Sequence, residues 1–119
     1  MYSIATDPGN NRILVTFTKD FDYEADDLIA ELKGAIAAVK RTDGTFDILS
    51  DFTDVSVMPQ DHADISEGFL QWLSDNGLRK SANVMKSLIQ RMQVNRVSGN
   101  NEKIGVFEFR SEAEKWLAQ

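Results

Sequence analysis

The sequence predicts an α/β fold: a five-stranded mixed sheet with four helices, in the element order ββαβαβαβα. Segments rich in β-branched and aromatic residues alternate with segments whose apolar residues recur at helical spacing. The first two strands are separated only by a turn, which favours antiparallel pairing, whereas each later strand is reached through a helix, which requires parallel pairing. A length of 119 residues fits a single domain, 1–119, and no repeat or linker marks an internal boundary.

The first half of the chain predicts a hairpin, a helix and a central strand. Residues 2–6 and 12–18 are expected to pair across the turn cluster Asp7-Pro8-Gly9-Asn10. A helix is expected over about 23–40, with Asp22 as its N-cap. Its apolar stripe consists of Leu28, Leu32, Ala35, Ile36 and Val39. The apolar run at 46–52 is typical of a strand covered on both faces.

The second half predicts three further helices and two strands. A helix should begin near Asp61 or Asp64 and end at Gly77. Context, rather than its polar composition, then predicts a strand at about 81–85. A helix over 85–97 and a strand over 103–109 are expected next. The last helix is expected over 111–118, with Ser111 and Glu114 as a capping box.

Composition excludes several functional classes. The chain has no cysteine, which removes disulfides, zinc ribbons and thiol catalysis. A net charge of −6 argues against general binding to nucleic acid or to anionic membranes. Residues 1–78 carry 15 acidic and 5 basic side chains, and residues 79–119 carry 4 and 8, so the halves hold −10 and +4. This asymmetry suggests a polar contact surface, for example in a homodimer that pairs acidic half with basic half.

The location expected from the sequence is the cytoplasm. The amino-terminal segment lacks the basic and apolar regions of a secretory signal. The longest apolar runs fall far short of the roughly 20 residues that span a bilayer. We therefore expect no membrane span.

The element order over nearly the whole chain, and its ending, resemble the SpoIIAA-like proteins. The ending is a strand at 103–109 followed by a helix with Ala113, Trp116 and Leu117 in the pattern A-x-x-W-L, which is similar to that of small stand-alone SpoIIAA-like proteins of bacteria. The fold is shared with STAS domains (sulfate transporter and anti-sigma-factor antagonist). The resemblance implies a non-enzymatic regulatory or protein-interaction module.

This sequence departs from the partner-switching STAS proteins at the phosphorylation site. In those proteins a Ser or Thr stands at the start of the helix that follows the central strand. Here Gln60 and Asp61 occupy that place, while Ser56 and Thr53 come too early. The resemblance therefore implies no phospho-acceptor in this chain.

The loop after the central strand is the predicted contact site for a protein partner. Open α/β sheets bind ligands at the carboxyl ends of their strands. Asp61 and Asp64 would repel an external phosphate at the following helix, so a nucleotide is not expected. The candidate contact residues are Thr53, Asp54, Ser56, Met58, Gln60, Asp61 and His62.

No catalytic or metal site is expected. His62 is the single imidazole, no G-x-S-x-G elbow is present, and no second His or Cys could join it on a metal. Asp47 and Asp51 could form an acid–base pair on one strand face, but such residues more often bond the backbone of the adjoining loop. We accordingly expect no cofactor and no enzymatic activity.

An apolar pocket is the alternative site. Its candidate residues are Met58, Phe69, Trp72, Met85 and Met92. They could carry a small apolar ligand or lipid, as CRAL-TRIO proteins of related fold do. Their helical and strand spacing is equally typical of ordinary core packing.

Overall fold

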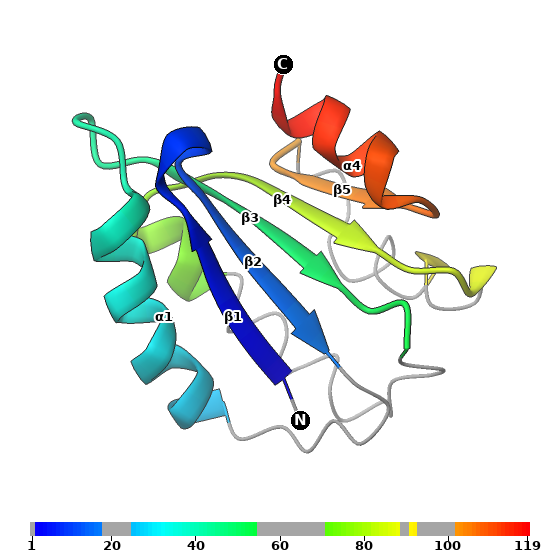
Figure 1. The fold of residues 1–119 in the computed structure, drawn as a ribbon, viewed down its shortest axis with the longest axis horizontal. Coiled ribbons are helices and arrows are strands. Elements are labelled where there is room, and N and C mark those ends of the chain that lie inside the picture. The colour runs from blue at the N-terminus through cyan, green and yellow to red at the C-terminus, as the bar shows by residue number, and fades with distance from the viewer. Residues whose placement is uncertain (1, 18–24, 55–70, 89–90, 93–101) are drawn as a thin grey trace.

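The computed structural model describes residues 2–17, 25–54, 71–88, 91–92 and 102–119. Within them, the sheet has five strands in the spatial order β1-β2-β3-β4-β5 (Figure 1). The strands are β1 (Tyr2–Asp7), β2 (Arg12–Phe17), β3 (Phe46–Asp51), β4 (Leu78–Val84) and β5 (Ile104–Phe107). β1 is antiparallel to β2, and the remaining neighbours are parallel. The predicted mixed α/β sheet is confirmed.

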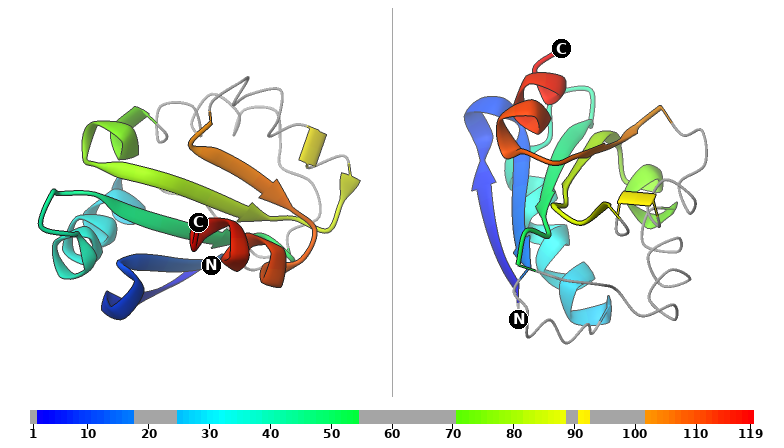
Figure 2. Two further views of the ribbon diagram at one scale, coloured as in Figure 1. Left: turned by 90° about the horizontal axis from the view of Figure 1, so that it is seen from above. Right: turned by 90° about the vertical axis from the view of Figure 1, so that its right-hand side faces the viewer.

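Two helices cover opposite faces of this sheet (Figure 2). On one face, α1 (Ala25–Val39) packs against alternate residues of β2, among them Ile13 and Val15. On the other face, α4 (Arg110–Leu117) packs Leu117 against Leu49 of β3. Alternation along each strand therefore supplies two separate hydrophobic clusters, as expected for a sheet covered on both sides.

The predicted apolar stripe of α1 is confirmed. Its five members are all buried: Leu28, Leu32, Ala35, Ile36 and Val39. Burying side chains of this size stabilises the fold by about 1.5–3 kcal/mol for each large aliphatic residue. The helix therefore forms because its stripe matches the apolar face of β1, β2 and β3.

Several predicted boundaries shift. The central strand ends at Asp51, the helix before Gly77 is seen over 71–75, and residue 88 rather than 85 is the first helical residue after β4. The expected starts at Asp22, Asp61 and Asp64 lie outside the described residues, as does Thr18 at the end of the hairpin.

The fourth strand begins earlier than predicted, at Leu78 instead of residue 81. The sequence does not indicate this earlier start, because Arg79 and Lys80 are both polar. Both side chains reach backbone oxygens at the end of α4, so their polarity is satisfied within a sheet. Met85, placed in the strand by the sequence, follows its end.

The predicted capping box at the last helix is wrong. α4 begins at Arg110, so Ser111 lies inside it, and the N-cap residue Phe109 makes no side-chain capping hydrogen bond. Glu114 instead accepts from Arg110 Nε at 3.2 Å, an (i, i+4) pair. The preceding strand is correspondingly shorter, Ile104–Phe107 instead of 103–109.

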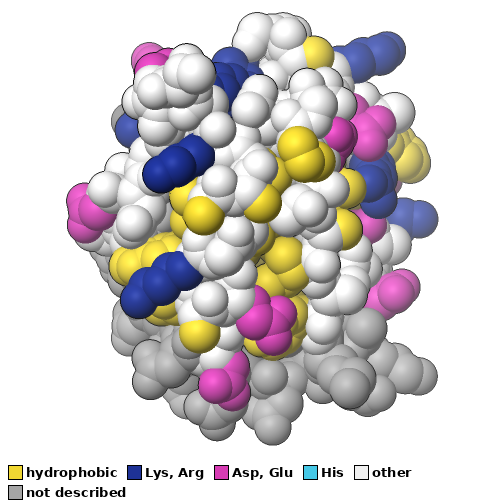
Figure 3. All heavy atoms as spheres, turned by 60° about the vertical axis from the view of Figure 1, so that its left-hand side comes forward, with side chains coloured by type: hydrophobic (Ala, Val, Ile, Leu, Met, Phe, Trp, Pro, Cys, Tyr) yellow, Lys and Arg dark blue, Asp and Glu magenta, His cyan; other side chains and the backbone are white. Residues whose placement is uncertain are grey.

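No helix in the described part of the chain is long and apolar enough to cross a membrane. On the face that comes forward in Figure 3, acidic and basic side chains are interspersed, with hydrophobic atoms between them. This face therefore does not present a surface of a single charge sign.

Candidate functional site

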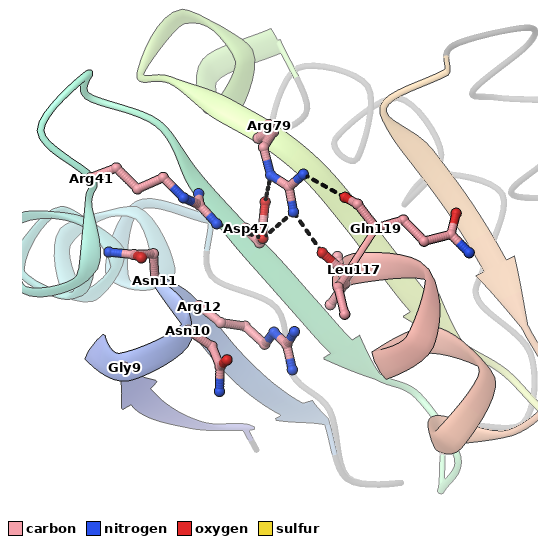
Figure 4. A pocket seen from close by; sticks show the side chains of 10 residues that line it. Gly9, Asn10, Asn11, Arg12, Arg41, Asp47, Arg79, Leu117 and Gln119 are labelled. Carbon is pink, nitrogen blue, oxygen red and sulfur yellow. Dashed lines mark hydrogen bonds and ion pairs between the residues drawn. The ribbon is translucent and has the colours of Figure 1, made fainter.

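A polar pocket lies at the edge of the sheet where β2, β3 and β4 begin and where α4 ends (Figure 4). Its volume is about 390 Å³. We call it the arginine pocket, and it is lined by Gly9, Asn10, Asn11, Arg12, Arg41, Asp47, Arg79, Leu117, Ala118 and Gln119. It is at the opposite edge from the predicted contact loop, which follows the carboxyl end of β3.

Asp47 is the centre of the arginine pocket. Its side chain is only 1% exposed, and it lies on β3 between the buried residues Phe46 and Ile48. Arg79 donates from Nε to Oδ1 at 2.8 Å and from Nη2 to Oδ2 at 2.7 Å, and Arg41 Nη2 donates to Oδ2 at 3.1 Å. Two arginines thus bind one carboxylate, one of them in the paired geometry that guanidinium favours. Hydrogen bonding to Asp47 raises the pKa of Arg79, against an opposing effect of burial.

A β-bulge positions Arg79, the arginine that forms the paired bonds to Asp47. Phe46 pairs with Leu78, but Asp47 pairs with Lys80, so Arg79 is the extra residue on β4. A bulge redirects side chains locally. Here it lets the consecutive residues Arg79 and Lys80 both reach the end of α4.

Both of these cations bind backbone oxygens at the C-terminal end of α4. Arg79 donates to Leu117 O at 2.6 Å and to Gln119 O at 3.1 Å. Lys80 Nζ donates to Trp116 O at 3.1 Å and lies 4.9 Å from the centroid of the Trp116 ring. The last carbonyl groups of a helix have no partners within it and favour positive charge. The pocket therefore fixes α4 to β4.

A tight turn positions Arg41. The Arg41 N–H donates to Thr45 O at 2.8 Å, and the Asp43 carboxylate accepts from Thr45 Oγ1 at 2.7 Å and Thr45 N at 3.0 Å. These bonds, the side-chain bond first, lower the pKa of Asp43. The turn packs against Gly77, which has φ +103°. A Cβ there would collide with the Gly44 carbonyl oxygen, so only glycine allows this close approach.

The start of β2 is positioned by Asn11. Its backbone is left-handed, with φ +52°, a conformation that Asn adopts more readily than most residues. The Asn11 carbonyl accepts from the Asp47 N–H at 3.0 Å, and its Nδ2 donates to Val39 O, the last residue of α1, at 2.7 Å. Asn11 thereby joins β2, β3 and α1 around the pocket.

Arg12 is buried in this pocket, and the described residues offer its side chain no partner. The residue is 9% exposed, and its Nε atom has no hydrogen-bond acceptor among the described residues. Arg41 Nη1 is likewise buried and has no acceptor in the part of the chain that the structure describes. In Figure 4, Arg12 extends from the start of β2 toward the end of α4, and no interaction connects it to the other residues drawn.

The groups that line the pocket are hydrogen-bond donors and acceptors. Both oxygens of Asp47 are bonded by arginines, and arginine stays protonated in proteins. The lining residues include no Ser, Thr, Cys, Lys or His that could serve as nucleophile or base. The described residues also contain no group of three His, Cys, Asp or Glu able to hold a metal ion.

Only the first two residues of the predicted contact loop are described. Asp51 Oδ1 accepts from the Thr53 N–H at 2.9 Å, so Asp51 bonds the backbone of the loop, as the sequence suggested. Asp54 is exposed. The other candidates, Ser56, Met58, Gln60, Asp61 and His62, lie outside the described residues.

The candidates for an apolar pocket occupy different environments. Trp72 packs partly buried against the cluster under α1, and Met85 is buried after β4. Met92 is 54% exposed. Met58 and Phe69 lie outside the described residues.

The exposed large hydrophobic side chains of the described residues follow the carboxyl ends of two strands. Among the described residues, the exposed large hydrophobics are Leu88, Met92 and Phe109, at 63%, 54% and 54%. Leu88 and Met92 follow the end of β4, and Phe109 follows the end of β5. This is the edge at which the Thr53 loop begins.

No motif in the sequence marks the arginines of the pocket. The available signal is Asp47, a charged residue between the apolar residues Phe46 and Ile48, since a carboxylate that is buried in a strand requires an opposite charge. Arg12 and Arg79 are the charged residues at the starts of the neighbouring strands, and parallel pairing brings such positions together.

Comparison with known proteins identifies the fold. No protein-family model and no curated protein matches the chain. A solved structure from Shewanella loihica PV-4, described as an uncharacterized protein of the DUF3478 family with a SpoIIAA-like fold, is similar at a TM-score of 0.63 and 15% identity. The match covers 98% of this chain and 93% of that chain. This chain therefore has the SpoIIAA-like fold that its element order predicted.

Proposed function

We propose that this chain is a non-enzymatic regulatory or interaction module that contacts a protein partner at the carboxyl edge of its sheet. The observation that supports this is the position of its exposed hydrophobic residues. Leu88, Met92 and Phe109 all follow carboxyl ends of strands, although the described part of the chain offers many other surface positions. Large apolar side chains that are exposed near the ligand-binding edge of a sheet are candidates for contact with a protein partner.

The loop that follows β3 also supports a partner contact at the carboxyl edge. The hydrogen bond from the Thr53 N–H to Asp51 fixes the direction in which the chain leaves β3. The carboxyl edge is also where open α/β sheets bind their ligands. The SpoIIAA-like fold is consistent with a contact role, and the arginine pocket contains no reactive group that would point to catalysis.

Site-specific crosslinking tests this proposal. The photoreactive residue p-benzoylphenylalanine is placed at position 109, and in a matched control at position 38, where exposed Ala38 lies on α1. Both proteins are irradiated in a lysate of the organism that encodes the chain. We expect a discrete protein adduct from position 109, and at least a fivefold lower yield from position 38.

A second variant links the adduct to the exposed edge. Met92→Ser in the position-109 protein should lower the adduct yield, because it removes an exposed apolar contact. The adduct mass decides between a second copy of this 13.4 kDa chain and a different protein. Equal yields from positions 109 and 38, or no adduct at all, contradict the proposal.

A further inference from the structure

The arginine pocket has more positive charge than its own residues neutralise. Arg79 makes four hydrogen bonds, two to Asp47 and one each to the backbone oxygens of Leu117 and Gln119. Asp47 is the single acidic side chain of the lining, and it bonds two of the three guanidinium groups there, those of Arg41 and Arg79. The excess therefore belongs to Arg12 and Arg41.

Of these two arginines, Arg12 gives the stronger indication that the pocket binds an anion. The described residues offer its side chain no hydrogen bond and no ion pair, although it is 9% exposed and its Nε is buried. A charged group buried without a partner is strongly unfavourable, and native structures supply an acceptor for nearly all such groups. A guanidinium in this position is therefore available to bind an anion.

Arg41 presents a second donor to the same pocket. Its Nη2 shares Asp47 Oδ2 with Arg79, and its Nη1 is buried and unpaired. Figure 4 shows Arg41 entering from the turn after α1 and Arg12 from the start of β2. The hydrogen bonds between Arg79 on β4 and Asp47 on β3 fix the shape of the pocket.

Asn10 and Asn11, which also line the pocket, add uncharged hydrogen-bonding groups. Asn10 Nδ2 donates to Asp7 Oδ2 at 2.9 Å, and Asn11 Nδ2 donates to Val39 O at 2.7 Å. Each Nδ2 has one printed hydrogen bond and a second N–H, so both the side-chain oxygens and the remaining N–H groups are available to a ligand. These oxygens accept hydrogen bonds, for example from a hydroxyl group.

We propose that the arginine pocket binds a small hydroxylated molecule through a carboxylate or phosphate group, with Arg12 and Arg41 as the donors. Guanidinium binds either oxyanion in the same paired geometry. A volume of about 390 Å³ exceeds one such group and admits the body of a small organic ligand. This site is distinct from the partner contact at the opposite edge, and neither proposal depends on the other.

Thermal unfolding at constant ionic strength tests the site. The probes are inorganic phosphate, glycerol 3-phosphate and glycerate, with glycerol as the uncharged control. Since a ligand that binds only the native state stabilises it by RT ln(1 + L/Kd), where L is the free ligand concentration, we expect the Tm to rise with the concentration of at least one anion and not with glycerol. Comparing the phosphates with glycerate shows which oxyanion the pocket prefers.

Arg12→Met is the decisive variant. It should weaken the response tenfold or more, while the Tm without ligand stays equal or rises, because an unpaired buried charge has been removed. Arg110→Met is the matched control, since it removes the same charge from the exposed start of α4 and should keep the wild-type response.

Two results would overturn the proposal: no Tm rise with any of the three anions in the wild-type protein, or an equal rise in Arg12→Met. If Arg12→Met does not fold, Arg12→Gln replaces it. In addition, the Nε–H resonance of Arg12 in the wild-type protein should shift on titration with the active probe. A resonance that stays unchanged at saturating probe would also refute the site.

Discussion

Arg79 binds Asp47 through two parallel hydrogen bonds, from Nε to Oδ1 at 2.8 Å and from Nη2 to Oδ2 at 2.7 Å. The same guanidinium donates to Leu117 O and Gln119 O, at the end of α4. One side chain therefore joins the centre of the sheet to a helix about 40 residues further along the chain. The stability of the fold and the shape of the arginine pocket depend on the same pair.

Asp47→Asn should lower the free energy of unfolding by about 3 kcal/mol, near the lower end of the cost of breaking a buried ion pair. The lower end applies because Arg41 and Arg79 are 28% and 32% exposed, so water partly compensates them. Urea unfolding measures the change. Asp54→Asn, at an exposed position, should change the free energy by less than about 0.5 kcal/mol. Similar values for the two variants would refute the role of Asp47.

Arg79→Lys should release the end of α4 although it keeps the charge. An ammonium group cannot form the paired bonds to Asp47 and also reach Leu117 O. We expect a loss of about 2 kcal/mol, the range of one charge-assisted hydrogen bond. Amide hydrogen exchange should show faster exchange in α4.

Arg110→Lys is the control for this variant. Arg110 makes an exposed pair with Glu114, which contributes about 0.5 kcal/mol or less. Exchange in the second half of α4 should therefore remain at the wild-type rate. If Arg79→Lys also left that rate unchanged, Arg79 would not be what holds the helix.

The sheet could be predicted because its strands differ in composition from the helices. The apolar residues Phe46, Ile48 and Leu49, the run at 13–15 and the stripe of α1 identify elements that are stabilised mainly by burial. The start of β4 could not be predicted because Arg79 and Lys80 are polar residues of the kind common in loops. Only their tertiary contacts with the end of α4 make them compatible with a strand. Polar strands of this kind are not recognisable from local pattern.

The arginine pocket could not be predicted for a related reason. Arg12, Arg41 and Arg79 are widely separated in the sequence, and none belongs to a motif. Their meeting depends on the strand order β2-β3-β4 and on a bulge at Arg79. The sequence expectation followed the general rule that α/β sheets bind at the carboxyl edge, whereas this pocket is at the amino edge.

Gly77→Ala and Gly34→Ala should change stability in opposite directions. Gly77 has φ +103° and no room for a Cβ beside Gly44 O, so alanine should lower the free energy of unfolding by about 2 kcal/mol or more. Gly34 is exposed in α1 with open space around it, so alanine should raise the free energy by about 0.5–1 kcal/mol. Denaturant midpoints measure both. A stabilised Gly77→Ala would show that the turn at 41–45 is not packed as described.

The raised pKa of Tyr2 makes the stability of the protein depend on pH in the alkaline range. Burial, and then the charge and hydrogen bond of Glu31, raise the pKa of Tyr2 above its ordinary value of 10.0. Because the folded state favours the neutral phenol, this contribution to stability is complete below about pH 10 and is lost as the pH rises through the pKa of the folded state.

Glu31→Gln should therefore move the pKa of Tyr2 toward 10.0 without reaching it, because the effect of burial remains. Absorbance at 295 nm follows tyrosinate formation, and Tyr23→Phe in all proteins leaves Tyr2 as the single tyrosine that titrates. Glu112→Gln, which removes an equal charge from α4, should leave the titration curve in place. A curve that Glu31→Gln does not shift would show that Glu31 exerts no influence on the phenol, and that the 3.4 Å contact between Tyr2 and Glu31 does not persist in solution.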